Sequence, residues 1–237
     1  FARVWHGDAE SDGFNALIVG AGLAWREIVV LRAYCKYLRQ VGITYSQTYM
    51  EQTLARHPEF ARLLVQMFMA GFDPAKGKKA TDLEKLRARY KEKLDGVASA
   101  DEDRILSRFL NMIDATLRTN YFQPDEDGNR KSYVSFKIDS RKVEEMPLPR
   151  PFREIWVYSP RVEGVHLRFG LVARGGLRWS DRPEDFRTEV LGLVKAQQVK
   201  NAVIVPVGSK GGFVCKRPPA DGGRDAFFEE GIARYKI

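Results

Sequence analysis

The chain has 237 residues, a hydrophobic content of 44%, a charged content of 30% and a formal net charge of +8. These values are typical of a globular protein with one large domain or two modest ones. A membrane-spanning helix is not expected. The longest apolar segment, residues 16–25, ends at Arg26, and a span requires ~18 apolar residues.

The N-terminal part of the chain predicts helices. Apolar residues recur at steps of three or four from Phe14 to Leu38, which indicates a single amphipathic helix over residues 14–41 with Gly42 as its stop signal. Another helix is expected from Pro58 to about residue 71. Three capping boxes predict further helix starts: Thr44 with Gln47, Thr81 with Glu84, and Ser99 with Glu102. The last two are expected to open helices over residues 82–97 and 100–119.

A glycine-rich segment at residues 16–23 is similar to the start of a dinucleotide-binding fingerprint. Trp25 stands where the third glycine of that fingerprint would fall, and the apolar spacing is already helical from Phe14 onward. We therefore interpret Gly20 and Gly22 as small residues that let two helices pack closely, and not as a cofactor site.

The apolar period changes in the C-terminal half, where short strands alternate with helices. The strands are predicted over residues 132–139, 154–158, 165–169 and 202–205, and the helices over residues 183–198 and 225–237. We thus predict a fold of the α+β or α/β class. It consists of a helical bundle over residues 1–122, followed by a mixed α/β substrate domain over residues 123–237 that is incomplete and has no Rossmann domain.

No metal site is expected. Cys35 and Cys215 lack a spacing typical of zinc ligands, and we interpret both as small buried side chains in a reducing compartment. The acidic turn at residues 124–129 lacks the ligand spacing and the closing glutamate of a calcium loop.

Cationic residues concentrate around two glycine-rich segments near the C-terminal end. Residues 168–217 contain ten Lys or Arg and four Asp or Glu. These cations stand at predicted turns and strand ends, whereas a nucleic-acid binder would more often place them along one helix face with stacking aromatics. The arrangement favours a compact ligand with two carboxylates, and we expect no nucleic-acid partner.

Three of these cations are candidate ligand-binding residues. Arg174 is followed by Gly175 and Gly176, so an anion can approach its planar guanidinium closely. Lys200 stands where helix gives way to strand, and Lys210 lies in a second glycine-rich turn. Like charges and partial burial lower the pKa of a lysine, which would make Lys210 a general base.

The other charged side chains of this segment are interpreted as structural. Asp181 and Asp185 are expected to serve the start of the following helix, and His166 to be a structural residue of its strand. Surface positions are predicted for Arg182, Arg187 and Lys216.

Three segments carry a resemblance to a known family. Residues 173–182, 188–201 and 206–212 look like the substrate domain of glutamate dehydrogenases, most of all the very large bacterial NAD-specific class. Residues 14–73 resemble the helical segment before the catalytic domain of that class. The resemblance implies oxidative deamination of L-glutamate to 2-oxoglutarate and ammonia, with hydride passed to NAD.

The resemblance also implies roles for individual residues. Lys210 matches the catalytic lysine, which activates water and handles protons at the imine stage. Lys200 matches the lysine that binds the α-carboxylate of the substrate, and Arg174 matches the binder of its side-chain carboxylate. The remaining substrate-binding positions are Gly175, Gly176, Arg178 and Gly211.

Several expectations concern the whole protein. The chain is expected to be a fragment that offers half a substrate pocket, with NAD bound by a domain outside it and no turnover alone. The complete enzyme is expected to be a cytoplasmic homo-oligomer. Two alternatives stay open: a regulatory or binding module that senses a dicarboxylate, and an assembly surface between subunits formed by the helical half.

Overall fold

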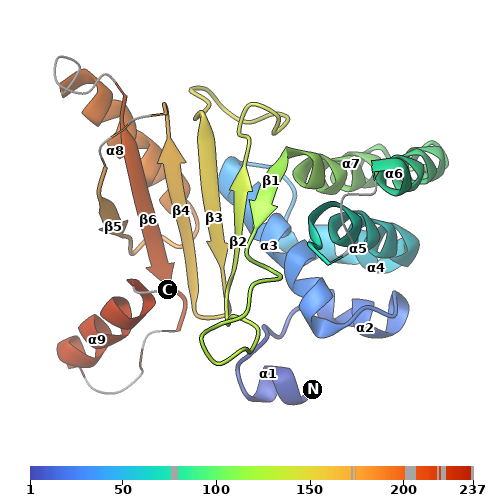
Figure 1. Ribbon diagram of the computed structural model, residues 1–237, viewed down its shortest axis with the longest axis horizontal. Helices are drawn as coiled ribbons and strands as arrows, with labels where there is room; N and C mark the ends of the chain where they lie inside the picture. The colour runs from blue at the N-terminus through green and yellow to red at the C-terminus, as the bar shows by residue number, and fades with distance from the viewer. Residues whose placement is uncertain are drawn as a thin grey trace.

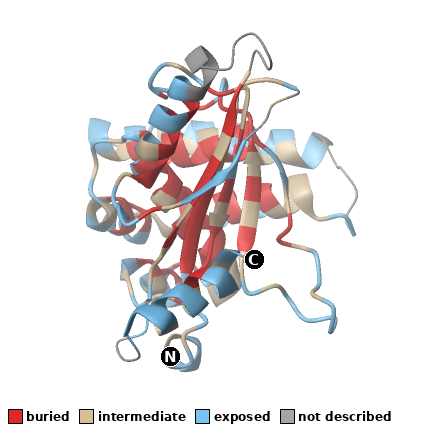
Figure 2. Ribbon diagram, turned by 90° about the vertical axis from the view of Figure 1, so that its left-hand side faces the viewer, coloured by how far each residue is buried: buried red, intermediate tan, exposed pale blue. Residues whose placement is uncertain are grey.

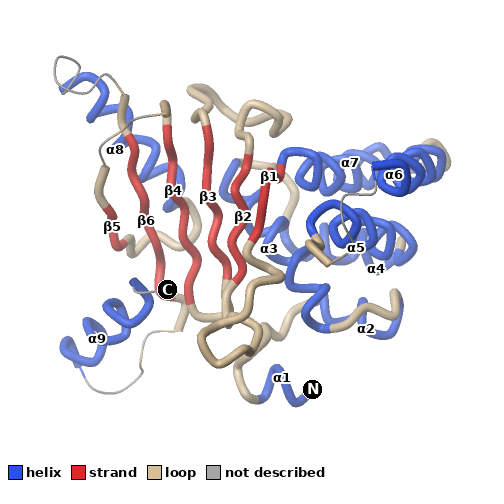
Figure 3. The backbone as a smooth tube through the Cα atoms, in the orientation of Figure 1, coloured by secondary structure: helices blue, strands red, loops and turns tan. Residues whose placement is uncertain are grey.

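A six-stranded sheet with helices on one face and beyond one edge forms the centre of the molecule (Figure 1). The computed structural model describes residues 1–75, 80–171, 173, 175–200, 207–217, 219 and 223–235. Helices precede the sheet along the chain, and the mixed class predicted from the sequence is confirmed. Figure 3 shows this division into a helical part and a strand-rich part.

The N-terminal part consists of helices, several of which pack on α3, which spans Trp25–Val41. Gly42 ends α3 in the left-handed conformation with a φ of 104°, as predicted. The remaining helical segments before the sheet are α1 (Ala2–Trp5), the 3-10 helix η1 (Gly13–Ala16), α2 (Leu17–Gly20), α4 (Gln47–Arg56), α5 (Pro58–Phe72), α6 (Ala80–Leu94) and α7 (Ala100–Ala115).

The structure corrects three boundaries in this part. The single helix expected over residues 14–41 is interrupted at residues 21–24, where Gly22 has a φ of 64°. The cap of α4 is Ser46, whose hydroxyl accepts from the backbone of Tyr49, and not Thr44. Helix α7 begins after Ser99 as predicted but ends at Ala115, because the next four residues pair with a strand and leave the helix.

The sheet has the order β1-β2-β3-β4-β6-β5, and its neighbouring strands are antiparallel except for the parallel pair β5 and β6. Three predicted strands are confirmed with shifts of a few residues: β2, β3 and β4. The bounds are β1 Thr116–Thr119, β2 Val134–Ile138, β3 Arg153–Tyr158, β4 Val162–Arg168, β5 Leu177–Trp179 and β6 Ser209–Cys215.

Helix α8 (Phe186–Lys200) connects the parallel strands β5 and β6, so these three elements form a β-α-β unit. Helix α9 (Gly223–Tyr235) comes after β6 in the chain. Both glycine-rich segments were predicted as turns, but Lys210, Gly211 and Gly212 lie inside β6, which pairs with β4 and β5. The strand predicted over residues 202–205 lies outside the described residues.

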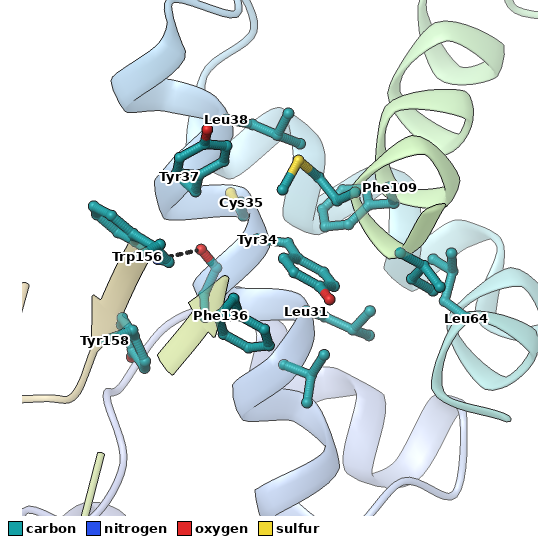
Figure 4. Close-up of a cluster of buried hydrophobic side chains, with 14 of the residues drawn as sticks. Leu31, Tyr34, Cys35, Tyr37, Leu38, Leu64, Phe109, Phe136, Trp156 and Tyr158 are labelled. Carbon is teal, nitrogen blue, oxygen red and sulfur yellow. Dashed lines mark hydrogen bonds between the residues drawn. The ribbon is translucent and has the colours of Figure 1, made fainter. Parts of the chain in front are cut away.

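Helices α3 and α8 cover one face of the sheet. Cross-strand partners Phe136, Trp156 and Val165 form a buried apolar row on that face. The indole of Trp156 donates to the carbonyl of Ala33 in α3 at 3.0 Å, which joins the sheet to the helical part (Figure 4). One cluster of buried side chains therefore runs through both parts, and the boundary at residues 122 and 123 stays a prediction.

The opposite face of the sheet is more open, and α9 covers it only beside β5 and β6. Trp179 stacks on Phe213 and on Phe227 of α9, with ring centroids 5.9 and 4.5 Å apart. A cavity of about 140 Å³ remains between the strands and the end of α9, lined in part by Ile155 and Leu177. Figure 2 shows buried residues along the central strands and exposed residues on the outer helix turns.

The interpretation of the glycines at residues 16–23 is wrong. A Cβ atom added at Gly20 or Gly22 would meet no atom within 4 Å, so neither glycine is required for close helix packing. Gly22 instead supplies the positive φ at the break between α2 and α3.

The expectation for the two cysteines is half right. Cys35 is completely buried, whereas the Cys215 side chain at the end of β6 is only partly buried. In the part of the chain that the structure describes, no helix combines the length and the apolar composition of a membrane span.

Candidate active site

The β-α-β unit brings the predicted site segments to one edge of the sheet. Residues 175 and 176 directly precede β5, Lys200 is the last residue of α8, and Lys210 is the second residue of β6. Figure 1 shows that β6 starts at the upper end of the sheet, beside β4. The amino ends of the two parallel strands β5 and β6, which are far apart in sequence, thus lie side by side.

The side chain of Lys210 is partly buried and lies over Gly176. The ammonium nitrogen is 3.4 Å from the position that a Cβ atom on Gly176 would occupy. The carbonyl of Gly176 accepts a hydrogen bond from the Gly211 backbone at 2.9 Å, which fixes the two segments side by side. Any side chain at residue 176 would therefore take up space next to the amine.

The face on which Lys210 lies follows from the strand register. A Cβ on Gly212 would overlap Val190 of α8, so Gly212 points toward α8. Residues two apart in a strand share a face, and Lys210 therefore points to the same side. Its cross-strand partner on β4 is Leu167, which is fully buried, so apolar contacts flank the lysine stem on this side.

Two other glycines allow close approaches between backbones. A Cβ on Gly175 would overlap the carbonyl oxygen and the hydroxyl of Ser209, which is 5% exposed. A Cβ on Gly211 would overlap the Leu177 side chain on the open face. Glycine is thus required at position 175 to bring the start of β5 against the start of β6.

Arg178 has a partner within the protein. Its guanidinium donates to the Glu189 carboxylate of α8 at 2.9 Å, and the Ser180 hydroxyl donates to the same carboxylate at 2.5 Å. Glu189 therefore fastens β5 to the first turn of α8. Glu189 and Ser209 were not predicted from the sequence, although an acid in the first turn of a helix is a recognisable signal.

A buried ion pair holds α8 against the middle of the sheet. Arg187 and Glu154 of β3 are 2% and 0% exposed, with nitrogen–oxygen distances of 2.5 and 2.9 Å. The Tyr37 hydroxyl of α3 donates to the same carboxylate at 3.0 Å. Burial opposes ionisation of Arg187, but Glu154 outweighs it and raises the pKa of the guanidinium above its usual value.

The surface positions predicted for three cations are correct for only one of them. Arg182 is exposed and pairs with Asp185, whereas Arg187 is buried. Lys216 is 14% exposed and bridges the carboxylates of Glu10 and Glu163. A cation can be buried when the fold supplies an acid at the right place, which the local sequence does not reveal.

Two predicted ligand-binding cations are not fully described. Arg174 lies outside the described residues, and only the backbone of Lys200 is described. The convergence of these two side chains with Lys210 therefore stays a prediction. His166 lies on the open face, opposite Lys210, beside Gly211. Burial, together with the charge of Arg168, lowers the pKa of His166.

The glycine-rich segment at residues 16–23 does not fit a dinucleotide. Residues 17–20 form helix α2, whereas the fingerprint needs a strand before its glycine loop. Among the described side chains, no group of three or more His, Cys, Asp or Glu is arranged to hold a metal ion.

Two family models match the chain. Residues 89–237 match the family described as bacterial NAD-glutamate dehydrogenase, catalytic domain. Residues 9–74 match the family described as glutamate dehydrogenase, helical motif 3. The first match covers more than half of the chain and includes the whole β-α-β unit with Lys210.

Curated relatives cover the complete chain. The chain is 57% identical to the NAD-specific glutamate dehydrogenase of Halomonas elongata over 237 residues and 55% identical to that of Pseudomonas aeruginosa over 241 residues, with 100% of the chain covered in each. It is 54% identical to that of Mycobacterium tuberculosis, with 99% covered. The chain spans only 15% of the length of each relative.

These matches and the fold assign the chain to a class of dehydrogenase catalytic domains. The chain belongs to the family of the bacterial NAD-glutamate dehydrogenase catalytic domain.

Proposed function

We propose that the protein is an NAD-dependent glutamate dehydrogenase that converts L-glutamate to 2-oxoglutarate and ammonia, and that this chain contributes the part of the active site that holds the substrate. NAD would accept the hydride and would be bound by a domain outside this sequence. The protein would act as a homo-oligomer in the cytoplasm, without a nucleic-acid partner.

The position of Lys210 over Gly176 carries this proposal. Gly176 places no side chain beside the partly buried amine, and the cross-strand partner of Lys210 is the buried Leu167. General acid–base catalysis needs a proton-transferring group within hydrogen-bond reach of the reacting atom. Lys210 is therefore the group that would activate water and move protons at the α-carbon of the bound substrate.

The other site residues would bind and orient the substrate. Lys200 would hold the α-carboxylate and Arg174 the side-chain carboxylate, because a guanidinium matches the geometry of a carboxylate. Arg178 would support the site indirectly, since its guanidinium is already bound to Glu189. Gly175, Gly176 and Gly211 would let the substrate and the strands approach each other closely.

Replacement of the lysine tests the proposal directly. In the intact enzyme, Lys210→Ala is expected to lower kcat for glutamate oxidation by at least ~100-fold, which is the usual contribution of a general acid or base. Lys195→Ala is the matched control, because Lys195 is an exposed lysine of α8 outside the site. An intact protein that oxidises glutamate equally well with Lys210→Ala would contradict the assignment.

The space over Gly176 offers a second measurement. In Gly176→Ala the new methyl group would lie 3.4 Å from the Lys210 amine, a distance that the fold tolerates. We expect KM for glutamate to rise while the unfolding temperature stays close to that of the wild type. An unchanged KM would show that the substrate does not use this space.

Binding measurements separate the dehydrogenase from a dicarboxylate sensor. Half an active site should bind 2-oxoglutarate weakly and should not oxidise glutamate when NAD is added to the 237-residue chain. Tight binding of 2-oxoglutarate to this chain in calorimetry, with no turnover by the intact protein, would favour the sensor.

A further inference from the structure

A second group of cations lies at the opposite end of β6 from Lys210. It surrounds a cavity of about 740 Å³ between α1, the start of α3, the loop before β2 and the turn between β3 and β4. Among the described residues that line this cavity, seven are Lys or Arg and one, Asp8, is an acid. We call it the basic cavity. Arg217, which lines it, follows Cys215, and five residue steps of strand at ~3.3 Å each place Cys215 about 16 Å from Lys210.

Three of the seven cations are paired with acids. Arg3 binds Asp8 at 2.9 Å, and both Arg161 and Arg234 bind Glu230 of α9 at 2.9 Å. Of these pairs, Arg161 with Glu230 links the turn between β3 and β4 to α9, whereas the other two lie within α9 and within the N-terminal segment.

The other four cations contact only backbone carbonyls or aromatic rings within the described part of the chain. Arg26 donates to the carbonyl of Lys131 at 3.0 Å, and the Lys131 amine lies 5.7 Å from the ring centroid of Tyr133. Arg130 and Arg217 donate to the carbonyls of Tyr121 and Gly7 at 3.2 and 3.4 Å. Four positive charges thus face one cavity without an acidic partner among the described side chains.

Arg26 gives the strongest indication that an anion belongs here. Its Nε and Nη2 atoms are buried and have no hydrogen-bond partner. Buried donors of a cation are almost always satisfied in folded proteins, because leaving them unpaired is costly. Burial lowers the pKa of Arg26 and the charge of Arg130 lowers it further, which an anion between the two guanidinium groups would reverse.

We propose that the basic cavity binds a small polyanion with three or more negative charges, an oligophosphate or a tricarboxylate. Its volume lies within the ~300–1,000 Å³ range of small-molecule sites, which favours a compact ligand over a nucleic acid or a protein surface. Guanidinium groups form paired, charge-assisted hydrogen bonds with phosphate and carboxylate groups. The four cations without an acidic partner come from three separate segments, so a bound polyanion would fasten α3, the loop before β2 and the end of β6 to one another.

Calorimetry on the intact protein tests this site without relying on any activity. Inorganic tripolyphosphate and citrate are the two probes, and each titration is run with and without saturating NAD. We expect at least one of the probes to bind with a one-to-one stoichiometry that NAD does not change. Tripolyphosphate alone would identify an oligophosphate site, and citrate alone a tricarboxylate site.

Charge-removing variants locate the binding. Arg130→Gln and Lys131→Gln change side chains that are exposed or partly exposed, and each should weaken binding by about tenfold or more, as loss of a charge-assisted hydrogen bond does. Arg26→Gln should have the largest effect. Arg89→Gln is the matched control, because it removes the same charge from an exposed position on α6.

Three results would overturn the proposal. These are no binding of either probe to the wild type, equal weakening by Arg89→Gln and by the cavity variants, and displacement of the probe by NAD. If Arg26→Gln does not fold, the two loop variants still decide the outcome. A failure of the dehydrogenase assays would leave these binding results unaffected, so the two proposals can fail separately.

Discussion

The contact between α5 and α7 in the helical half and the contact of α8 with β3 in the sheet half are held together by different interactions. Between α5 and α7 the interior is apolar, and Leu64 and Phe109 are completely buried. Beneath β3 the interior instead contains the ion pair of Arg187 and Glu154, capped by Tyr37. Apolar side chains can pack in more than one relative orientation, whereas an ion pair with bidentate hydrogen bonds fixes the orientation of the helix that carries it.

This difference has a consequence for the candidate active site. Helix α8 begins at the buried ion pair and ends at Lys200, so the bonds of Arg187 fix the helix that leads to β6 and Lys210. Glu189 adds a second attachment, to β5. We infer that polar bonds fix α8 where the position of a site must be exact, whereas the contact between α5 and α7 needs only stable apolar packing.

Breaking the ion pair is expected to have the largest effect on stability. Arg187→Met leaves the Glu154 carboxylate buried with Tyr37 as its one donor among the described residues, which should lower the free energy of unfolding by about 3–5 kcal/mol. The measurement is urea unfolding of the protein at pH 7.

The same experiment has a built-in rescue. In the triple variant Arg187→Met, Glu154→Met, Tyr37→Phe no buried polar atom of this network is left, and most of the lost stability should return. Activity of the triple variant should nevertheless stay below that of the wild type, because α8 is no longer directionally fixed. Full activity in the triple variant would contradict the positioning role of the ion pair.

In the helical half, truncating a buried apolar side chain should lower the stability without a comparable rescue. It should have little effect on activity. Leu64→Ala removes a completely buried side chain of α5 and should cost about 2–5 kcal/mol, depending on how far the surroundings close around the cavity. We expect KM for glutamate to be unchanged at temperatures where the variant is folded. A KM shift as large as that of Gly176→Ala would show that the two halves are coupled through the core.

A pair of glycine substitutions compares the halves at the scale of one methyl group. Gly175→Ala would force the new Cβ against the Ser209 backbone, and overpacking of this kind costs about 1–3 kcal/mol. Gly20→Ala, at the end of α2, meets no atom within 4 Å and should be neutral or slightly stabilising. The unfolding temperatures of the two variants test this comparison. Equal changes of the unfolding temperature would refute the close approach of residue 175 to Ser209.

The sequence predicted some of these features because their signals are local. The stops and starts at Gly42, Pro58 and Ser99 depend on neighbouring residues, and the structure confirms them. The motif around Lys210 is also local, so the family was recognisable from it.

Other features depend on contacts that are distant in sequence. Lys210, Gly211 and Gly212 were predicted as a turn because glycine disfavours strands, but pairing with β4 and β5 outweighs that preference. Arg187 was placed on the surface because its acid partner lies 33 residues away. The basic cavity could not be predicted at all, since its cations come from separate segments that meet only in the folded chain.

The smallest effect we expect concerns His166 on the open face of the sheet. The pKa of His166 is lowered in the folded protein, first by burial and then by Arg168, relative to its usual value of ~6.5. The unfolded chain therefore binds a proton more readily, and the free energy of unfolding falls as the pH drops below about 6.5. Carboxylates with lowered pKa, such as Glu10, titrate below this range.

Thermal unfolding between about pH 5.5 and 7.5 isolates this contribution. In His166→Gln the decrease of the unfolding temperature toward pH 5.5 should become shallower, because the side chain that must stay neutral in the fold is gone. His6→Gln, which changes an exposed histidine after α1, should keep the decrease of the wild type. If the unfolding temperatures of both variants depend on pH in the same way, the decrease toward pH 5.5 does not come from His166 on the open face. The covered and open faces of the sheet then do not differ in their sensitivity to acid.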